Sequence, residues 1–138
     1  MPYGYRKRLI KCGLYGPFSN FIQQESTFWA KELLDTIKYD ELSNYKYAGD
    51  YYLWKKFANI AELYIAKAYL GGFRAVKNQI SSNKKAYFSE MRRIADNITF
   101  IDKVLFIIDQ ITMRLPSRIT DRINRNIIKY NCKTDNWE

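Results

Sequence analysis

The 138-residue sequence contains no histidine and only two cysteines, Cys12 and Cys132, which stand near opposite ends. Without histidine the chain can form neither a Ser-His-Asp triad nor a Cys-His dyad, and it offers no imidazole ligand to a metal. The two cysteines lack the spacing of a zinc site or a disulfide framework, so we expect a reduced, cytosolic setting. Any general base must be a carboxylate, lysine, tyrosine or cysteine.

Acidic residues are also few, because 14 Asp and Glu stand against 23 Lys and Arg, for a formal net charge of +9. This excess favours an anionic partner: nucleic acid, a phospholipid surface or a phosphorylated ligand. Long apolar runs are missing too, so we expect no bilayer-spanning segment, and the basic amino terminus lacks the apolar core of a secretory signal. Hydrophobic residues make up 47% and aromatic residues 17%, which is enough for the packed core of one domain.

The first segment, residues 1–21, is rich in Gly, Pro and basic side chains and has no apolar period, which predicts an arm or loop. Ser26 can then act as the N-cap of a short helix near 27–37. Within that stretch Trp29 and Leu33 recur at helical spacing, which supports the helix.

A second helix is predicted to begin at Asp50. Apolar residues recur along one of its faces, at Leu53, Phe57, Ile60 and Tyr64. Periodicity alone would continue this helix to Leu70. The stretch 63–66 is apolar on both faces, however, and fits a buried strand equally well.

The second half is predicted to open with one long helix from about Asn83 to Leu115. Its apolar residues alternate in steps of four and three, as in a heptad seam, at Tyr87, Met91, Ile94, Ile98, Ile101, Leu105 and Ile108. Seven seam positions are few for a free-standing coiled coil, so we expect the seam to pack within the chain, or else to join a homo-oligomer through 87–108. After Pro116 a carboxy-terminal amphipathic helix is predicted, with a basic row at Arg118, Arg122, Arg125 and Lys129.

Three short strings of unusual content follow one another in order. The first is QQESTFW at 23–29, the second is GDYYLWKKF at 49–57, and the third is LGGFR at 70–74, which continues into KNQIS at 77–81 with Tyr87 and Glu90 beyond. Together they resemble the carboxy-terminal half of family 2 glycosyltransferases, particularly bacterial members that assemble polysaccharides. The likeness runs from about Ile22 to Ile94, and three colinear strings are more specific than any one of them.

The resemblance implies the acceptor-side part of a GT-A fold, of α+β class and mainly helical, with a helix over about 50–59 and strand-like segments through Phe73. It implies that Asp50 is the general base that deprotonates the acceptor hydroxyl, which requires a carboxylate facing a cleft. The residues that it implies for substrate binding are Gln24, Glu25, Ser26 and Arg74. A guanidinium at Arg74 suits paired hydrogen bonds to a pyrophosphate.

Each of these residues also has an ordinary structural interpretation. Asp50 could simply cap its helix, and residues 24–26 could satisfy backbone groups ahead of the next one. Arg74 could form a structural ion pair with Asp50 or another carboxylate. For Asp50, the register with Leu53 and Trp54 favours the catalytic interpretation.

Two departures from the family pattern bear on activity. Val76 stands where many relatives carry a histidine that helps to hold the cation of the nucleotide diphosphate, and valine cannot ligate a metal. Upstream of Gln23 nothing resembles a βαβ nucleotide-binding unit or an acidic pair for Mg²⁺ or Mn²⁺. We therefore expect a glycosyltransferase fragment, inactive alone and without a cofactor or metal of its own. With a donor-half polypeptide it would transfer a sugar from a nucleotide-sugar to a saccharide or lipid-linked acceptor.

The expected organisation has three parts: a basic arm or loop at 1–21, a glycosyltransferase-like acceptor-side segment at 22–82, and a helical extension at 83–138. The alternative is a non-catalytic helical assembly module, or one that binds an anionic membrane surface through its basic row. Nucleic acid is disfavoured because the aromatic residues lie at core-like spacing and are not interleaved with basic clusters. We expect a cytoplasmic location, or a peripheral one at the inner membrane face.

Overall fold

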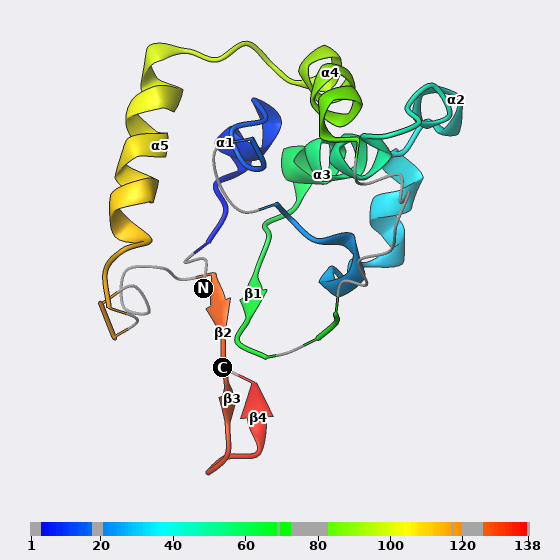
Figure 1. Cartoon of the computed structure of the whole chain (residues 1–138). Coiled ribbons are helices and arrows are strands. Elements are labelled where there is room, and N and C mark those ends of the chain that lie inside the picture. The colour runs from blue at the N-terminus through cyan, green and yellow to red at the C-terminus, as the bar shows by residue number, and fades with distance from the viewer. Residues whose placement is uncertain are drawn as a thin grey trace.

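Figure 1 shows the computed structural model of the chain, which is mainly helical with a few short strands and so confirms the α+β class in its coarse form. The residues that it describes are 4–17, 21–68, 70–72, 83–116, 118–119 and 126–137. Its elements are α1 (Lys7–Lys11), the 3-10 helices η1 (Gln24–Ser26) and η2 (Lys31–Thr36), α2 (Tyr39–Leu42), α3 (Gly49–Ile60), β1 (Ile65–Ala66), α4 (Lys84–Ile94), α5 (Phe100–Thr112), β2 (Ile127–Ile128), β3 (Tyr130–Asn131) and β4 (Asn136–Trp137).

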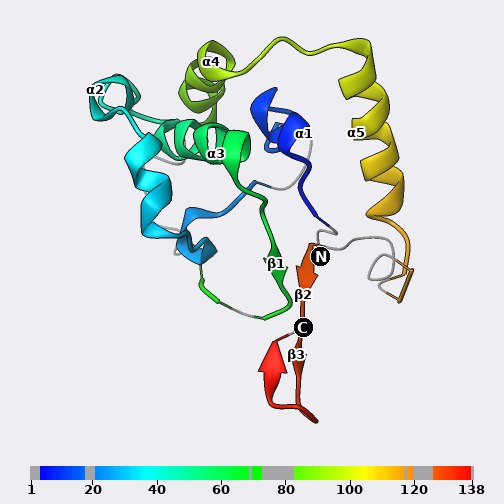
Figure 2. The same cartoon turned by 180° about the vertical axis from the view of Figure 1, so that it is seen from behind.

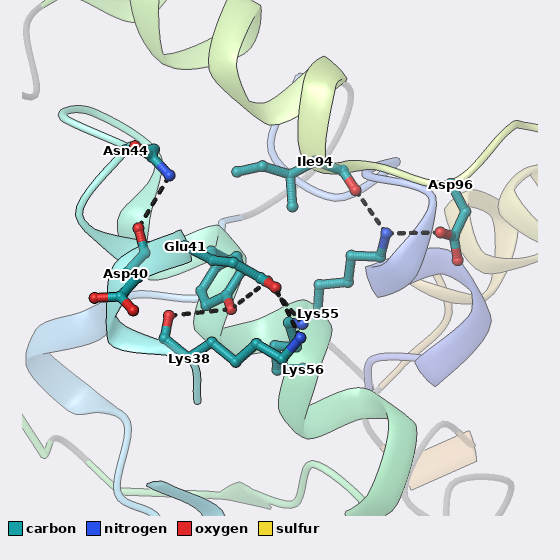
Figure 3. Close-up of polar contacts among 9 residues, drawn as sticks. Lys38, Asp40, Glu41, Asn44, Lys55, Lys56, Ile94 and Asp96 are labelled. Atoms are coloured by element: carbon teal, nitrogen blue, oxygen red, sulfur yellow. Dashed lines mark hydrogen bonds and ion pairs between the residues drawn. The ribbon is translucent and has the colours of Figure 1, made fainter. Parts of the chain in front are cut away.

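Helix α3 is the centre of the fold, and the helix predicted over 50–59 is confirmed. α1, η2 and α4 all pack against it. Its buried side chains are Tyr51, Tyr52, Trp54, Phe57 and Ala58. Glu41 of α2 accepts a hydrogen bond from the Tyr52 hydroxyl at 2.8 Å and another from Lys56 Nζ at 3.1 Å. Figure 3 shows the contact between Glu41 and Lys56. Removing this much aromatic surface from water is the main stabilising term.

The arm or loop predicted over 1–21 is wrong for residues 7–15, which form α1 and part of the core. The buried side chains there are Leu9, Ile10, Cys12, Leu14 and Tyr15. The chain turns sharply at Gly13, which has φ +68, and a Cβ there would lie 3.0 Å from the Met91 methyl carbon and 3.2 Å from the Tyr51 hydroxyl. Glycine is therefore required at this close approach. A five-residue helix is too short to show a hydrophobic period.

The helix predicted near 27–37 with Ser26 as its N-cap is wrong in type and bounds. Thr27 and Ala30 have extended backbone, and the 3-10 helix η2 begins only at Lys31, with Ala30 as its N-cap. The apolar spacing nevertheless identifies a residue that packs on the core. The Trp29 ring lies 5.7 Å from the ring of Trp54 and packs against α3. The apolar spacing therefore reported which side chains pack, not the backbone conformation.

The prediction of a single long helix from Asn83 to Leu115 is wrong. The chain forms two helices there, α4 and α5, and α5 ends at Thr112. Figure 1 shows the extended connection between the two helices. Lys55 binds the end of α4, with its Nζ 2.6 Å from the Ile94 carbonyl oxygen and 2.7 Å from Asp96 Oδ1 (Figure 3). A capping box formed by Thr99 and Asp102 starts α5. The positions of the predicted seam are therefore divided among α4, α5 and the connection between them, which contains Ile98.

The predicted carboxy-terminal helix is wrong for residues 126–131, which form a turn and two strands. β2 pairs in parallel with β1, with Ile127 opposite Ile65, so the strand alternative for 63–66 is confirmed at Ile65–Ala66. β3 and β4 form an antiparallel pair. Within that prediction, Arg122 and Arg125 lie outside the described residues.

One hydrophobic core draws on all three of the predicted segments. Leu9 comes from the amino-terminal segment, Trp54 from the middle one and Met91 from the carboxy-terminal one, and each is buried in the same cluster. None of the helices in the described part of the chain has the length and apolar content needed to cross a bilayer.

Candidate functional site

Asp50 lies in the first turn of α3 and is partly buried. Its Oδ1 accepts a hydrogen bond from the Tyr51 N–H at 2.7 Å, and the Tyr87 side chain of α4 also hydrogen-bonds to its carboxylate. Burial raises the pKa of Asp50 above its usual range, although these hydrogen bonds oppose the rise. Burial, and then the negative charge of Asp50, likewise raise the pKa of Tyr87. A carboxylate with a raised pKa accepts a proton more readily than an ordinary surface aspartate.

Glu90 of α4 caps the amino-terminal end of α3. Its carboxylate accepts hydrogen bonds from the N–H groups of Tyr47 at 2.7 Å and Ala48 at 2.8 Å, and from that of Lys46 at 3.2 Å. Burial favours a higher pKa for Glu90, but these bonds outweigh it and the pKa is lowered. The N-cap residue, Ala48, has no side-chain acceptor. Glu90 therefore holds the turn that leads into α3, while Asp50 accepts the N–H of Tyr51 in the first turn of the helix.

Glu25 links Asp50 to the described part of the third sequence string. Glu25, from the first string, is close enough for its charge to raise the pKa of Asp50. Gly71, from the third string, lies against the backbone of Glu25, since a Cβ on Gly71 would be only 2.5 Å from the Glu25 carbonyl oxygen. Only glycine fits such an approach without a backbone shift. Residues from 23–29, 49–57 and 70–72 are thus brought together.

An open cleft of about 630 Å³ lies beside η1. Its lining includes Phe21, Gln23, Ser26, Phe28, Tyr64, Leu70 and Ile128. Ser26 is therefore placed on a cleft, whereas Gln24, Glu25 and Asp50 are not among the described residues that line it. Gln24 and Glu25 are exposed on η1. Arg74 and Val76 lie outside the described residues.

A second cluster of buried charges joins α1 to α5, and the sequence had given no indication of it. Asp109 has no exposed surface, and it accepts hydrogen bonds from Arg6 Nε at 2.7 Å and from the Tyr15 hydroxyl at 2.9 Å. Asp102 is 2% exposed and pairs with Arg8, whose hydrogen bond lowers the pKa of that carboxyl to about 2. The feature of the sequence that could have pointed to it is a pair of aspartates seven residues apart on a mainly apolar helix.

The described residues do not fit a divalent-cation site. Among them no group of three or more Cys, Asp or Glu side chains is placed to hold a metal ion. Asp50 and Glu25 are near each other, but two carboxylates without a third ligand and a fixed geometry do not make such a site. Around Asp50 the structure thus places a partly buried carboxylate that is hydrogen-bonded to the Tyr51 N–H and to the Tyr87 side chain. A scan of protein-family models gives no match to the chain, and neither the curated proteins nor the solved structures give a significant one.

Proposed function

We propose that this chain is the acceptor-side portion of a family 2 glycosyltransferase. With a donor-binding half supplied by another polypeptide, it would transfer a sugar from a nucleotide-sugar to a saccharide or lipid-linked acceptor. The observation that supports this most is the setting of Glu25, whose charge acts on the partly buried Asp50 and whose backbone lies against Gly71, so that residues from all three strings come near one another. Asp50 accepts the first-turn N–H of Tyr51, as a capping residue would, but its burial and its hydrogen bond with Tyr87 exceed what a cap requires.

In the proposed reaction Asp50 accepts the proton of the acceptor hydroxyl while the hydroxyl oxygen bonds to the anomeric carbon of the sugar. The bond from that carbon to the nucleoside diphosphate breaks, and the leaving group takes the bonding electrons. Burial would keep the pKa of Asp50 raised, and the hydrogen bond from Tyr87, which opposes that rise, would hold the carboxylate in place. Gln24, Glu25 and Ser26 would hydrogen-bond the acceptor, and Arg74 is proposed to contact the pyrophosphate.

Mg²⁺ or Mn²⁺ would enter with the nucleotide-sugar on the donor half, and no step above depends on a metal held by this chain. Calorimetry should accordingly detect no binding of UDP, GDP or Mn²⁺ to the chain alone. We place the activity in the cytoplasm, or at the inner face of the membrane if the acceptor is lipid-linked.

The test is sugar transfer in the presence of donor halves of bacterial family 2 enzymes. We expect Asp50→Asn to lower the rate of transfer by about 100-fold or more, the usual contribution of a general base. Asp40→Asn is the matched control, because Asp40 is an exposed aspartate at the start of the neighbouring helix α2. Circular dichroism should show both variants folded. Two results would contradict the proposal: sugar transfer that survives in Asp50→Asn, and a wild-type chain that transfers no sugar with any of the donor halves.

The second candidate is a non-catalytic module that binds a membrane surface. It is favoured by a different part of the molecule, the exposed apolar face of α5.

A further inference from the structure

Helix α5 is packed with its charged side inward. Its buried residues are the two aspartates, Asp102 and Asp109, held by Arg8 and Arg6. Only Leu105 and Phe106 of its apolar residues pack against the core, and both remain partly exposed. In Figures 1 and 2 α5 stands at the edge of the molecule beside α1, on the side away from α2.

The outer face of α5 and of the turn that follows it forms a continuous apolar stripe. Its members are Phe100, Ile101, Val104, Ile107, Ile108, Ile111 and Leu115. At about 100° per residue they fall within roughly 120° of the helix surface, and no polar side chain lies between them. The exposed fractions are large, at 79% for Phe100 and 59% for Ile111. Isolated exposed apolar residues are ordinary, but a contiguous patch of this kind marks an interaction surface.

The charges next to the stripe have one sign. Lys103 and Arg114 lie along one edge of the stripe, and both are exposed. The acidic residues of α5 are both buried, so the only charged side chain that the helix exposes is that of Lys103. Arg118, just beyond the helix, is exposed as well. Long basic side chains beside an apolar face can extend to lipid phosphates while their stems stay in the interface.

We propose that α5 binds an anionic membrane surface, with its apolar stripe among the upper acyl chains and Lys103 and Arg114 at the lipid phosphates. This arrangement is that of an interfacial amphipathic helix, and the charges on α5 are complementary to anionic lipid. A second copy of this chain suits the stripe less well, because it would bring the same basic edge and the same net charge of +9. A 13-residue helix, about 20 Å long, is also short for a stable protein interface.

This inference goes beyond the glycosyltransferase proposal and does not rest on it, because α5 lies outside the residues that resemble the family. It also replaces the basic row of the predicted carboxy-terminal helix as the membrane contact. The test can therefore fail while the proposed function of Asp50 stands, and the reverse also holds.

The experiment is flotation of the full chain with vesicles of phosphatidylcholine alone and of phosphatidylcholine mixed in equal parts with phosphatidylglycerol. We expect binding to the mixed vesicles and much weaker binding to the neutral ones. The double variant Ile107→Glu with Ile111→Glu should bind about 100-fold or more weakly, because each substitution removes an apolar side chain from the lipid. Lys103→Gln with Arg114→Gln should weaken binding by about tenfold and reduce its salt dependence.

Ile60→Glu is the matched control. Ile60 is 57% exposed, the same fraction as Ile107, but it lies at the end of α3 and away from the stripe. Its substitution should leave vesicle binding unchanged, and thermal melts should show that all variants fold. Three results would overturn the proposal. These are no binding of wild type to the mixed vesicles at moderate salt, an Ile107→Glu, Ile111→Glu variant that binds like wild type, and a concentration-dependent dimer that this double variant abolishes.

Discussion

α3 and α5 are helices of similar length with opposite packing. α3 buries its aromatic face in the core, and its partly exposed lysines, Lys55 and Lys56, bind groups on α4 and α2. α5 buries two aspartates against α1 and leaves its aliphatic face exposed. Both are amphipathic, so amphipathicity alone does not say which face is turned to the protein. The neighbouring element determines which face is buried. Arg8 of α1, and Arg6 just before it, form ion pairs with the aspartates of α5.

The two helices should differ most in what their apolar residues contribute to stability. Phe57→Ala on α3 removes a ring that packs against Trp29 and Trp54, and it should lower the free energy of unfolding by about 3–5 kcal/mol. Ile107→Ala on α5 removes side-chain surface that is already in water, so the change should stay within about 0.5 kcal/mol. Urea denaturation of both variants measures the difference. A loss of more than about 2 kcal/mol in Ile107→Ala would contradict the outward orientation of the stripe.

The ion pairs of α5 should contribute less to the free energy of unfolding than the ring of Phe57 does. Lowering the pH should reveal their contribution. The pKa of Asp102 is lowered to about 2 in the folded chain, below the value near 3.9 of an unfolded aspartate. The contribution of this carboxylate is therefore complete above about pH 4, and it is lost as the pH falls toward 2. We expect about 1 kcal/mol from it, because Arg8 is half exposed and solvent weakens the pair.

Denaturation of wild type and of Asp102→Asn between pH 6 and about pH 2 isolates this contribution, since other carboxylates titrate in both proteins. Glu41 is another carboxylate that titrates in this pH range in both proteins. A hydrogen bond from Tyr52, and others from Lys56 and Lys38, lower its pKa to about 2. The stability difference between the two proteins should shrink in acid. A difference that is independent of pH would mean that Asp102 is not ionised against Arg8.

The sequence predicted α3 well as a helix. The predicted apolar face is correct only in part: Phe57 is buried, but Ile60 and Tyr64 are exposed. The core covers a neighbouring side of the helix, which carries Tyr51, Trp54 and Ala58. The sequence also brought Asp50, Glu25 and Gly71 to attention before their contacts were known, although only through a family resemblance. Tyr87 and Glu90 were noticed as part of that pattern, but their roles at Asp50 and at the α3 cap depend on how α4 packs.

Prediction failed where long-range partners decide the structure. Heptad spacing continues through the break between α4 and α5, and no glycine or proline marks it, so the two helices were joined into one. The local clue was the Thr99-x-x-Asp102 capping box. The orientation of α5 could not be read locally, because Arg8 and Asp102 are 94 residues apart. Likewise β2 forms only by pairing with a strand about half the chain away.

The outward orientation of the apolar face of α5 can be tested by thiol labelling in the absence of lipid. In a Cys132→Ser background, the Ile107→Cys variant should react with a thiol reagent at nearly the rate of an unfolded peptide. The Ile94→Cys variant should react at least about 100-fold more slowly than that. Ile94 is buried at the end of α4, so a reagent reaches this position only by local opening. Equal protection at positions 107 and 94 would contradict the account.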